Sequence, residues 1–234
     1  MKREQTDDKR LIEVLSLSLV AALLAAVGAL VFLAWLADEV LEGETRPFDD
    51  ATRQAIHEWA SPTLTTVMRD VSFLGSSWFL FGLTAVSVAL LLMLRAKRQA
   101  MLLAITMGGS SLLDVTLKHA FQRPRPIPFF NLPAPNSYSF PSGHALASFC
   151  FYAGFAALLT ARLARRQAIA MWTAAVLLVF SIGFSRIYLG VHYITDVVAG
   201  YLAALIWIVA VRFVDLELSR RKKRKRGLKD HAKH

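Results

Sequence analysis

The sequence contains only one cysteine, Cys150, so the chain cannot form an internal disulfide. It has no glycine-rich nucleotide-binding loop and no internal repeat, and neither a nucleotide-binding fold of that kind nor a repeat architecture is expected. Acidic residues are outnumbered by basic ones, 17 to 27, but this excess does not indicate a nucleic-acid-binding protein. Seven consecutive basic residues, 220–226, follow an apolar segment, where attraction to anionic lipid headgroups accounts for them.

Apolar residues are abundant and make up 55% of the chain. The run from Leu15 to Ala37 holds 23 residues without a charge, enough for a helix to cross a hydrocarbon core of about 30 Å. It is longer than the apolar core of a signal peptide, and no small-x-small cleavage site precedes Asp38. We therefore expect an uncleaved membrane span.

The sequence predicts an all-α fold, an integral membrane bundle of six transmembrane helices with a short outer interfacial helix. The six spans are predicted at residues 15–37, 71–94, 100–117, 145–161, 168–184 and 197–211. The interfacial helix is predicted at 48–59, where Phe48, Ile56 and Trp59 recur at helical spacing; packing on the bundle explains this pattern equally well. The predicted domains are a cytoplasmic N-terminal segment at 1–10, a six-span domain at 11–216 and a basic cytoplasmic tail at 217–234.

The distribution of basic residues predicts the orientation of the bundle. Most of them, such as Arg95 and Arg98, fall in segments that are inside when both termini are cytoplasmic, as the positive-inside rule requires. The outer segments hold few cations, and four of them are Lys118, Arg123, Arg125 and Arg186. Bound phosphate gives a local reason for cations there. We therefore expect a multi-pass protein of a bacterial inner membrane with its functional site on the outer face.

Three short motifs at this outer side contain the residues that suggest chemistry. They are Lys118 with Arg125-Pro126, then Pro141-Ser142-Gly143-His144, and finally Ser185-Arg186 with His192 and Asp196. A phosphate monoester carries about two negative charges, which Lys118, Arg125 and Arg186 can meet. The backbone of Ser142 and Gly143, at the start of an apolar helix, can add N–H donors to the same group. The motifs therefore predict a phosphate-transfer site.

The two histidines suit the two roles that phosphate transfer requires. Asp196 stands four residues after His192, so in a helix its carboxylate can hold one ring nitrogen and aim the other at phosphorus. This spacing favours His192 as the nucleophile. His144 has Ala147 and Ser148 at the corresponding positions and no acidic partner, which leaves it to act as the general acid.

Several neighbours of these residues are ambiguous. Arg123-Pro124 directly precedes Arg125-Pro126. Only Arg125 is separated from Lys118 by the six residues of the motif, so Arg125 is assigned to phosphate binding and Arg123 is kept as the alternative. Asp114, four residues before Lys118, is expected to pair with it. His119 is expected to be structural or a minor substrate contact.

The loop at 119–138 contains five prolines and cannot be an ordinary helix. Phe129, Phe130 and Leu132 give it an apolar edge. This edge either lies at the lipid headgroup level, where it would guide a lipid chain, or packs on the bundle.

Together, the motifs at 118–196 resemble the signature of the type 2 phosphatidic acid phosphatase and vanadium haloperoxidase superfamily. The resemblance implies that His192 forms a phosphohistidine, that Asp196 orients it and that His144 protonates the leaving alcohol. The residues that match phosphate-binding positions of the family are Lys118, Arg125, Ser142, Gly143 and Arg186. The resemblance further implies that no metal or other cofactor is needed. The membrane spans favour the lipid phosphatase branch over the largely soluble haloperoxidases.

The expected function is hydrolysis of the terminal phosphate of a lipid phosphate or diphosphate, such as undecaprenyl diphosphate, phosphatidylglycerophosphate or phosphatidic acid. The motifs do not distinguish these lipids. Two alternatives remain open: a lipid phosphotransferase that uses the same site, and a non-catalytic lipid-phosphate binder or transporter. The expected partners are the lipid substrate and the bilayer, with anionic headgroups at the basic tail, and no nucleic acid.

Overall fold

The computed structural model describes residues 2–133, 135–160 and 163–231, and within these ranges it describes side chains from 20 to 221. The described residues form eight α-helices and no strand. The helices are α1 (Lys2–Glu42), α2 (Arg46–His57), α3 (Pro62–Phe73), α4 (Ser77–Met93), α5 (Lys97–Phe121), α6 (Gly143–Thr160), α7 (Arg165–Tyr188) and α8 (Ile194–His231). The all-α prediction is confirmed for this part of the chain.

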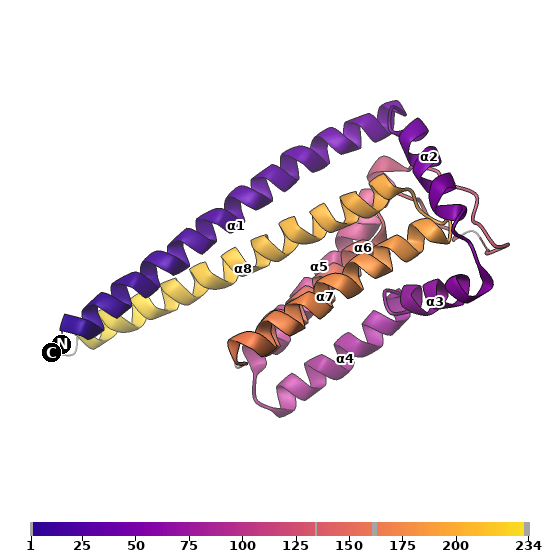
Figure 1. Ribbon diagram of the computed structural model, residues 1–234. Helices are drawn as coiled ribbons and strands as arrows, with labels where there is room; N and C mark the ends of the chain where they lie inside the picture. Colours follow the sequence, from indigo (N-terminus) through magenta and orange to yellow (C-terminus); the bar gives the residue numbers. More distant parts are fainter. Residues whose placement is uncertain (1, 134, 161–162, 232–234) are drawn as a thin grey trace.

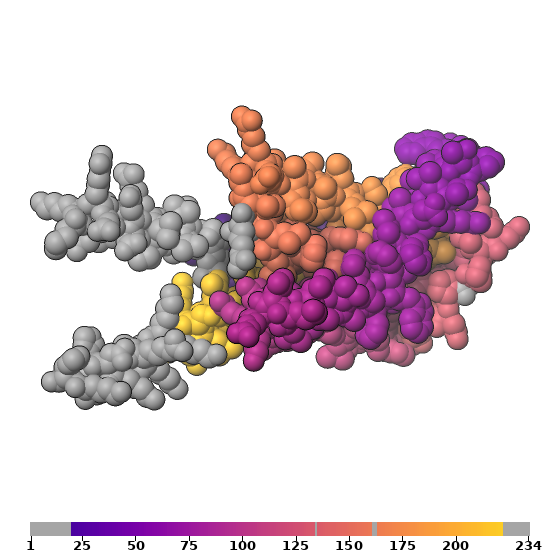
Figure 2. Space-filling model, turned by 90° about the horizontal axis from the view of Figure 1, so that it is seen from below, coloured from indigo at the N-terminus to yellow at the C-terminus, as the bar shows by residue number. Residues whose placement is uncertain are grey.

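The helices form an elongated bundle in which α1 and α8 lie side by side and antiparallel, with both ends of the chain at one end of the molecule (Figure 1). Helix α6 packs against α4, α5, α7 and α8 and is therefore the central element. The short helix α2 crosses the opposite end. Seen from below, α3 and α4 run beside α7, and the loop after α5 lies at the same end as α2 (Figure 2).

The lengths and surfaces of the helices fit a multi-pass membrane protein. Five of them are long and apolar enough to cross a bilayer, with spans at Val20–Glu42, Lys97–Phe121, Gly143–Thr160, Arg165–Tyr188 and Ile194–Arg221. Large apolar side chains are turned outward on these helices and also on α4, where Trp78 is 87% and Phe81 73% exposed. A water-soluble domain would not leave so much apolar surface in contact with water.

The predicted span at 71–94 is not one helix. Helices α3 and α4 meet at a bend of 44°, and the bundle has six spans only if this pair counts as one. Ser76 caps the N-terminus of α4, where its hydroxyl accepts the N–H of Phe79 at 3.4 Å. The turn also needs Gly75, because a Cβ there would lie 2.4 Å from Cγ2 of Ile182 on α7. The sequence carries a signal for this break, because Gly75-Ser76-Ser77 interrupts the apolar run with a turn residue and an N-cap serine.

Helix α2 occupies the segment predicted to be a short outer helix, but its buried face differs from the expected one. Ile56 is buried, whereas Phe48 and Trp59 are 59% and 64% exposed and Asp49 is completely buried. Helix α8 continues without a break through the basic segment that was predicted as a separate tail. Ala161, at the end of one predicted span, and residues 232–234 of that tail lie outside the described residues.

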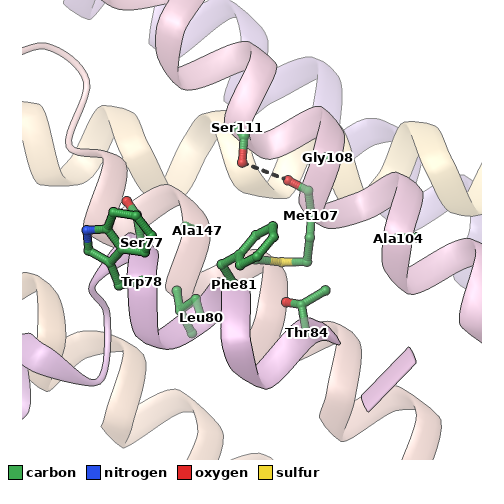
Figure 3. Close-up of a pocket in the computed structure, with 10 residues that line it drawn as sticks. All are labelled: Ser77, Trp78, Leu80, Phe81, Thr84, Ala104, Met107, Gly108, Ser111 and Ala147. Carbon is green, nitrogen blue, oxygen red and sulfur yellow. Dashed lines mark hydrogen bonds between the residues drawn. The ribbon is translucent and has the colours of Figure 1, made fainter. Parts of the chain in front are cut away.

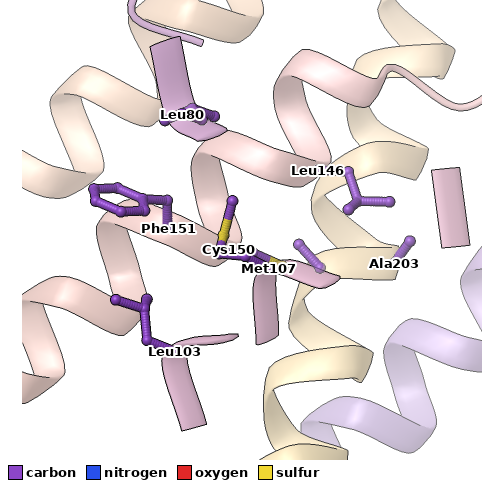
Figure 4. Packing of buried hydrophobic residues seen from close by; sticks show 8 residues of the cluster. Leu80, Leu103, Met107, Leu146, Cys150, Phe151 and Ala203 are labelled. Carbon is purple, nitrogen blue, oxygen red and sulfur yellow. The ribbon is translucent and has the colours of Figure 1, made fainter. Parts of the chain in front are cut away.

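The largest apolar cluster of the described residues lies at the centre of the bundle (Figure 4). Helix α6 contributes Leu146, Cys150 and Phe151, which meet Leu103 of α5 and Ala203 of α8. All five are less than 5% exposed. This packing fixes α6 relative to its neighbours and thereby positions the residues at its N-terminus.

The end of the bundle near the chain termini is held by a bidentate ion pair, and its loss should destabilise the protein. Arg98 donates from Nε and Nη2 to the two carboxylate oxygens of Asp215, each at 2.8 Å. Asp215→Asn should lower the free energy of unfolding by about 1 kcal/mol, measured as a lower melting temperature in detergent. Glu217→Gln, which removes an exposed pair with Arg221, is the matched control and should melt like the parent. Equal shifts in both variants would contradict a special role for the Arg98 pair.

Candidate active site

The three predicted motifs meet at the end of the bundle opposite the chain termini (Figure 1). Backbone hydrogen bonds join the loop at 122–142 to the turn at 189–193 and to α8. The N–H of Ser142 donates to the carbonyl of Asp196 at 2.9 Å, and the N–H of Phe129 donates to that of Leu189 at 3.1 Å. Segments that are far apart in the sequence are thus fixed against one another.

His192 and Asp196 are in contact, as their spacing predicts. Nδ1 of His192 lies 3.2 Å from Oδ2 of Asp196, which also accepts the N–H of Tyr193 at 2.9 Å and the hydroxyl of Ser139. His192 itself lies in the turn before α8 rather than inside the helix. Tyr193 precedes the helix and Asp196 is its third residue, so the contact between them is also a helix cap. The fold of this turn therefore fixes the carboxylate that holds the imidazole.

The environment of His192 favours a neutral ring. Burial lowers the pKa of His192 to about 3, against the opposing effect of the Asp196 carboxylate. At neutral pH the imidazole is then uncharged, with its proton on Nδ1 as the contact with Asp196 requires. Nε2 keeps a lone pair, and it accepts a hydrogen bond from Nη1 of Arg125 at 2.9 Å.

Arg125 is held in front of Nε2 of His192 by the loop at 122–142 and by the turn at 189–193. It donates from Nε to the carbonyl of Ser137 at 2.7 Å, from Nη2 to the hydroxyl of Ser137 at 2.9 Å, and from Nη1 to the carbonyl of Val191 at 2.9 Å. A phosphate that approaches Nε2 of His192 must therefore meet this guanidinium.

Lys118 forms the expected ion pair with Asp114 on α5, at 2.8 Å. Gly143 allows this pair to lie against the start of α6, because a Cβ on Gly143 would lie 2.6 Å from Oδ1 of Asp114. Ser142, in contrast, is completely buried, and its hydroxyl accepts the N–H of Ala145 at 3.5 Å as a helix cap. Its side chain thus has a structural contact besides any role in phosphate binding.

Arg186 and His144 complete the cluster. Nη1 of Arg186 donates to the hydroxyl of Ser72, while its Nε is buried without a hydrogen-bond partner among the described residues. Arg186, Arg125, Lys118 and His192 all lie within electrostatic range of His144. The structure thus brings together the cations and both histidines that the motifs single out.

Two cavities lie beside this cluster. The first, of about 740 Å³, is polar and is lined by Lys118, His119, Arg123 and Arg125 together with the loop at 135–138. The second, of about 480 Å³, is apolar and lies between α4, α5 and α6, with Trp78, Phe81 and Met107 in its wall (Figure 3). Ser77 lines both cavities, so a polar and an apolar compartment adjoin at the start of α4.

The aromatic residues of the proline-rich loop pack on the protein. The ring of Phe129 stacks on His57 with centroids 3.9 Å apart, and Phe130 stacks on Tyr188 at 5.4 Å. Of the two expectations for this apolar edge, the structure supports packing on the bundle. The hydroxyl of Tyr188 is likewise used within the protein, 2.9 Å from that of Thr65.

Three polar residues around Asp196 are not assigned by the motifs. Arg123 is buried and contacts Asp196, Ser139 hydrogen-bonds the same carboxylate, and Asp49 reaches Arg123 from α2. The sequence signals for Arg123 are the repeated Arg-Pro pair and its position among the cations on the outer side, and neither indicates a contact with Asp196. Asp49 lies on what looks like the polar face of its helix, so its spacing gives no hint of burial.

Comparison with known proteins agrees with this geometry. The profile of the PAP2 superfamily matches residues 99–218. Phosphatidylglycerophosphatase B of Bacillus subtilis is 31% identical over 197 residues, which cover 83% of this chain and 96% of that protein. This chain belongs to the PAP2 superfamily. The resemblance drawn from the motifs is therefore confirmed.

Further PAP2 proteins support the assignment. Undecaprenyl-diphosphatase of Sulfolobus acidocaldarius is 30% identical over 145 residues, which cover 60% of this chain and 65% of that protein. The crystal structure of a transmembrane PAP2 type phosphatidylglycerolphosphate phosphatase from Bacillus subtilis superposes with a TM-score of 0.76 at 30% identity, over 82% of this chain and 96% of the other. The helical architecture is therefore that of a PAP2 membrane phosphatase.

The close approach at Gly143 gives a test of the cation cluster. Gly143→Ala should displace Asp114 and with it the Lys118 ammonium, weakening the binding of inorganic phosphate by about tenfold. Binding can be measured as protection against thermal unfolding over a phosphate titration. The matched control is Gly154→Ala on the same helix, where a Cβ meets nothing within 4 Å. Unchanged phosphate protection in Gly143→Ala would show that the Asp114–Lys118 pair does not contribute to anion binding.

Proposed function

We propose that this PAP2 protein is an integral membrane phosphatase that removes a terminal phosphate from a lipid phosphate or diphosphate through a phosphohistidine on His192. The main support is the orientation of His192, whose Nδ1 is held by Asp196 while Nε2 faces Arg125. A neutral, oriented imidazole beside several cations is what nucleophilic attack on a phosphate ester requires. The names of the relatives, a phosphatidylglycerophosphatase and an undecaprenyl-diphosphatase, favour lipid phosphates as the substrate class.

In the first step of the proposed mechanism, the lone pair of Nε2 of His192 attacks phosphorus and the bond from phosphorus to the lipid oxygen breaks. The negative charge of the bound phosphate offsets the cations around His144 and keeps it protonated; His144 then gives its proton to that oxygen, so the lipid leaves as a neutral alcohol or as a lipid monophosphate. Asp196 keeps the Nδ1 proton and stabilises the positive charge that develops on the ring. Lys118, Arg125 and Arg186 neutralise the phosphoryl oxygens, with the backbone of Ser142 and Gly143 as further donors.

In the second step, water attacks the phosphoryl group of the phosphohistidine. His144, now neutral, accepts a proton from the water, and the bond from phosphorus to Nε2 breaks. Inorganic phosphate leaves, and His192 returns to its neutral state while His144 is again protonated. One histidine thus serves as acid and then as base, as a two-step hydrolysis requires.

The proposed reaction needs no metal. In metal-dependent phosphate transfer the ion neutralises the phosphoryl oxygens and stabilises the transition state. Here the three basic side chains supply that charge, and the buried Nε of Arg186, which lacks a partner among the described residues, is a donor available to a phosphate oxygen.

For the membrane arrangement, we propose six spans with α3 and α4 as one bent span, α2 at the outer interface, both termini cytoplasmic and the site on the outer face of a bacterial inner membrane. The adjoining cavities support a substrate with a polar head and an apolar chain. The head would occupy the cavity at Lys118 and Arg125, while the chain would lie along the compartment lined by Trp78 and Phe81.

The deciding experiment is phosphate release by the purified, detergent-solubilised protein from undecaprenyl diphosphate, phosphatidylglycerophosphate, phosphatidic acid and diacylglycerol pyrophosphate, with excess EDTA. We expect release that persists in EDTA and disappears in His192→Ala, because that variant has no nucleophile. Thermal unfolding of both proteins shows whether the variant is folded. Release that His192→Ala retains would contradict the mechanism, and release abolished by EDTA would contradict metal independence. Phosphate transfer to an added lipid or sugar acceptor without hydrolysis would identify a phosphotransferase.

The role of His144 can be tested with leaving groups of different basicity. His144→Ala should slow hydrolysis of a lipid phosphomonoester by about 10² to 10⁴-fold, because its alkoxide needs a proton as it leaves. It should slow formation of the phosphoenzyme from p-nitrophenyl phosphate far less, because that leaving group is stable as an anion. Rapid-quench measurement of the burst phase separates this step from hydrolysis of the intermediate. Equal losses for both substrates would rule out leaving-group protonation by His144.

A further inference from the structure

Asp49 is a completely buried carboxylate on α2, a helix that contributes none of the motif residues. A buried carboxylate is costly unless it is paired or fully hydrogen-bonded. Its sequence neighbour Asp50 is 51% exposed and pairs with Arg46 on the helix surface. The helix thus has one exposed carboxylate, Asp50, and one buried carboxylate, Asp49. The buried one needs partners inside the protein that offset the cost of its burial.

The partners of Asp49 are all close to the nucleophile. Its Oδ2 accepts Nη2 of Arg123 at 2.7 Å and the hydroxyl of Thr195 at 2.7 Å. Its Oδ1 accepts the backbone N–H of Thr195 at 3.1 Å. Thr195 lies in the first turn of α8, directly before Asp196. Asp49 therefore satisfies a backbone donor at the start of the helix that bears the orienting carboxylate.

Arg123 connects the two buried carboxylates. It uses Nη2 for Asp49 and Nη1 for Oδ1 of Asp196, both at 2.7 Å, while Oδ2 of Asp196 remains for His192. The guanidinium also lies over the ring of Tyr193, 4.3 Å from its centroid. The planar guanidinium reaches the two carboxylates from two different nitrogens in fixed directions, a geometry that the single nitrogen of an ammonium does not reproduce.

The charge balance of this cluster matters for catalysis. With His192 neutral, Asp49, Asp196 and Arg123 together leave one net negative charge in the interior. When Nε2 attacks phosphorus, the ring becomes positively charged and this charge stabilises it. Without Asp49, Arg123 and Asp196 would neutralise each other, and the developing imidazolium would lose its counter-charge.

We propose that Asp49 and Arg123 are positioning residues for the nucleophile: they fix the Asp196 carboxylate and keep the cluster behind His192 negatively charged. The inference rests on the proposed phosphohistidine mechanism. It adds α2 to the elements that determine activity, although no atom of α2 is required to touch the substrate.

The test compares Asp49→Asn with Asp50→Asn, two adjacent substitutions that each remove one negative charge from α2. Asp49→Asn should lower kcat and the rate of phosphoenzyme formation by about 10- to 100-fold with little change in KM, because the phosphate-binding cations are untouched. Asp50→Asn should match the parent. Protection by inorganic phosphate against thermal unfolding should be the same in all three proteins.

A double-mutant cycle separates positioning from a general structural role. Because Asp49 acts partly by fixing the Asp196 carboxylate, the two losses should be coupled: the double variant should lose less kcat than the product of the losses in Asp49→Asn and Asp196→Asn. Multiplicative losses in the double variant would overturn the proposal. So would an unchanged kcat in a folded Asp49→Asn protein, or a loss of phosphate protection that parallels the loss of activity.

Arg123→Lys provides a second route if Asp49→Asn does not fold. It keeps the positive charge but not the two-sided bridge, so it should retain phosphate protection and show a reduced kcat. Parent-like kcat in Arg123→Lys would contradict the need for the bridge. A parent protein that releases no phosphate from any lipid would instead refute the proposed function, which distinguishes the two failures.

Discussion

The buried carboxylate of Asp196 is the contact on which the catalytic end of the bundle depends. It holds the Nδ1 side of His192, caps the backbone of Tyr193, and accepts hydrogen bonds from Ser139 and Arg123. These partners come from the loop after α5 and from the turn before α8. A carboxylate buried this deeply is stable only if all these groups are in place, so the loop, the turn and the helix must be ordered together. Packing of the apolar core and formation of the site are therefore linked.

The membrane environment explains why this polar cluster lies at the helix ends. Within a bilayer, backbone N–H and C=O groups must be paired inside the protein, which long helices achieve along their length but not at their termini. The caps at the site satisfy the termini and place functional groups at once. Ser142 caps α6 two residues before His144, and Asp196, four residues after His192, caps the start of α8. Two of the catalytic candidates are thus positioned by contacts that the helices need in any case.

Spacing in the sequence predicts much of this arrangement, and the limits of that prediction have physical causes. The contact between His192 and Asp196 follows from a four-residue separation, and the pair formed by Asp114 and Lys118 follows from the same rule on α5. Both are local contacts within about one helical turn. Asp49 meets Thr195 across 146 residues, and no periodicity encodes an encounter at that separation. The close approach of α7 to Gly75 is likewise not encoded locally, although Gly75-Ser76-Ser77 marks the turn itself.

Positive and negative charges lie on opposite sides of His192, and the proposed reaction limits how much net negative charge the side behind the ring can carry. Cations lie where the phosphate would bind, and the cluster of Asp49, Arg123 and Asp196 lies behind the ring. More negative charge behind the ring would stabilise the phosphohistidine further, but it would also slow its hydrolysis, since that step returns the ring to neutrality. A bridge in which Arg123 offsets one of two carboxylates leaves an intermediate charge. This balance would suit the proposed covalent intermediate, which must both form and break down, and it would account for a buried arginine beside the carboxylate that holds His192.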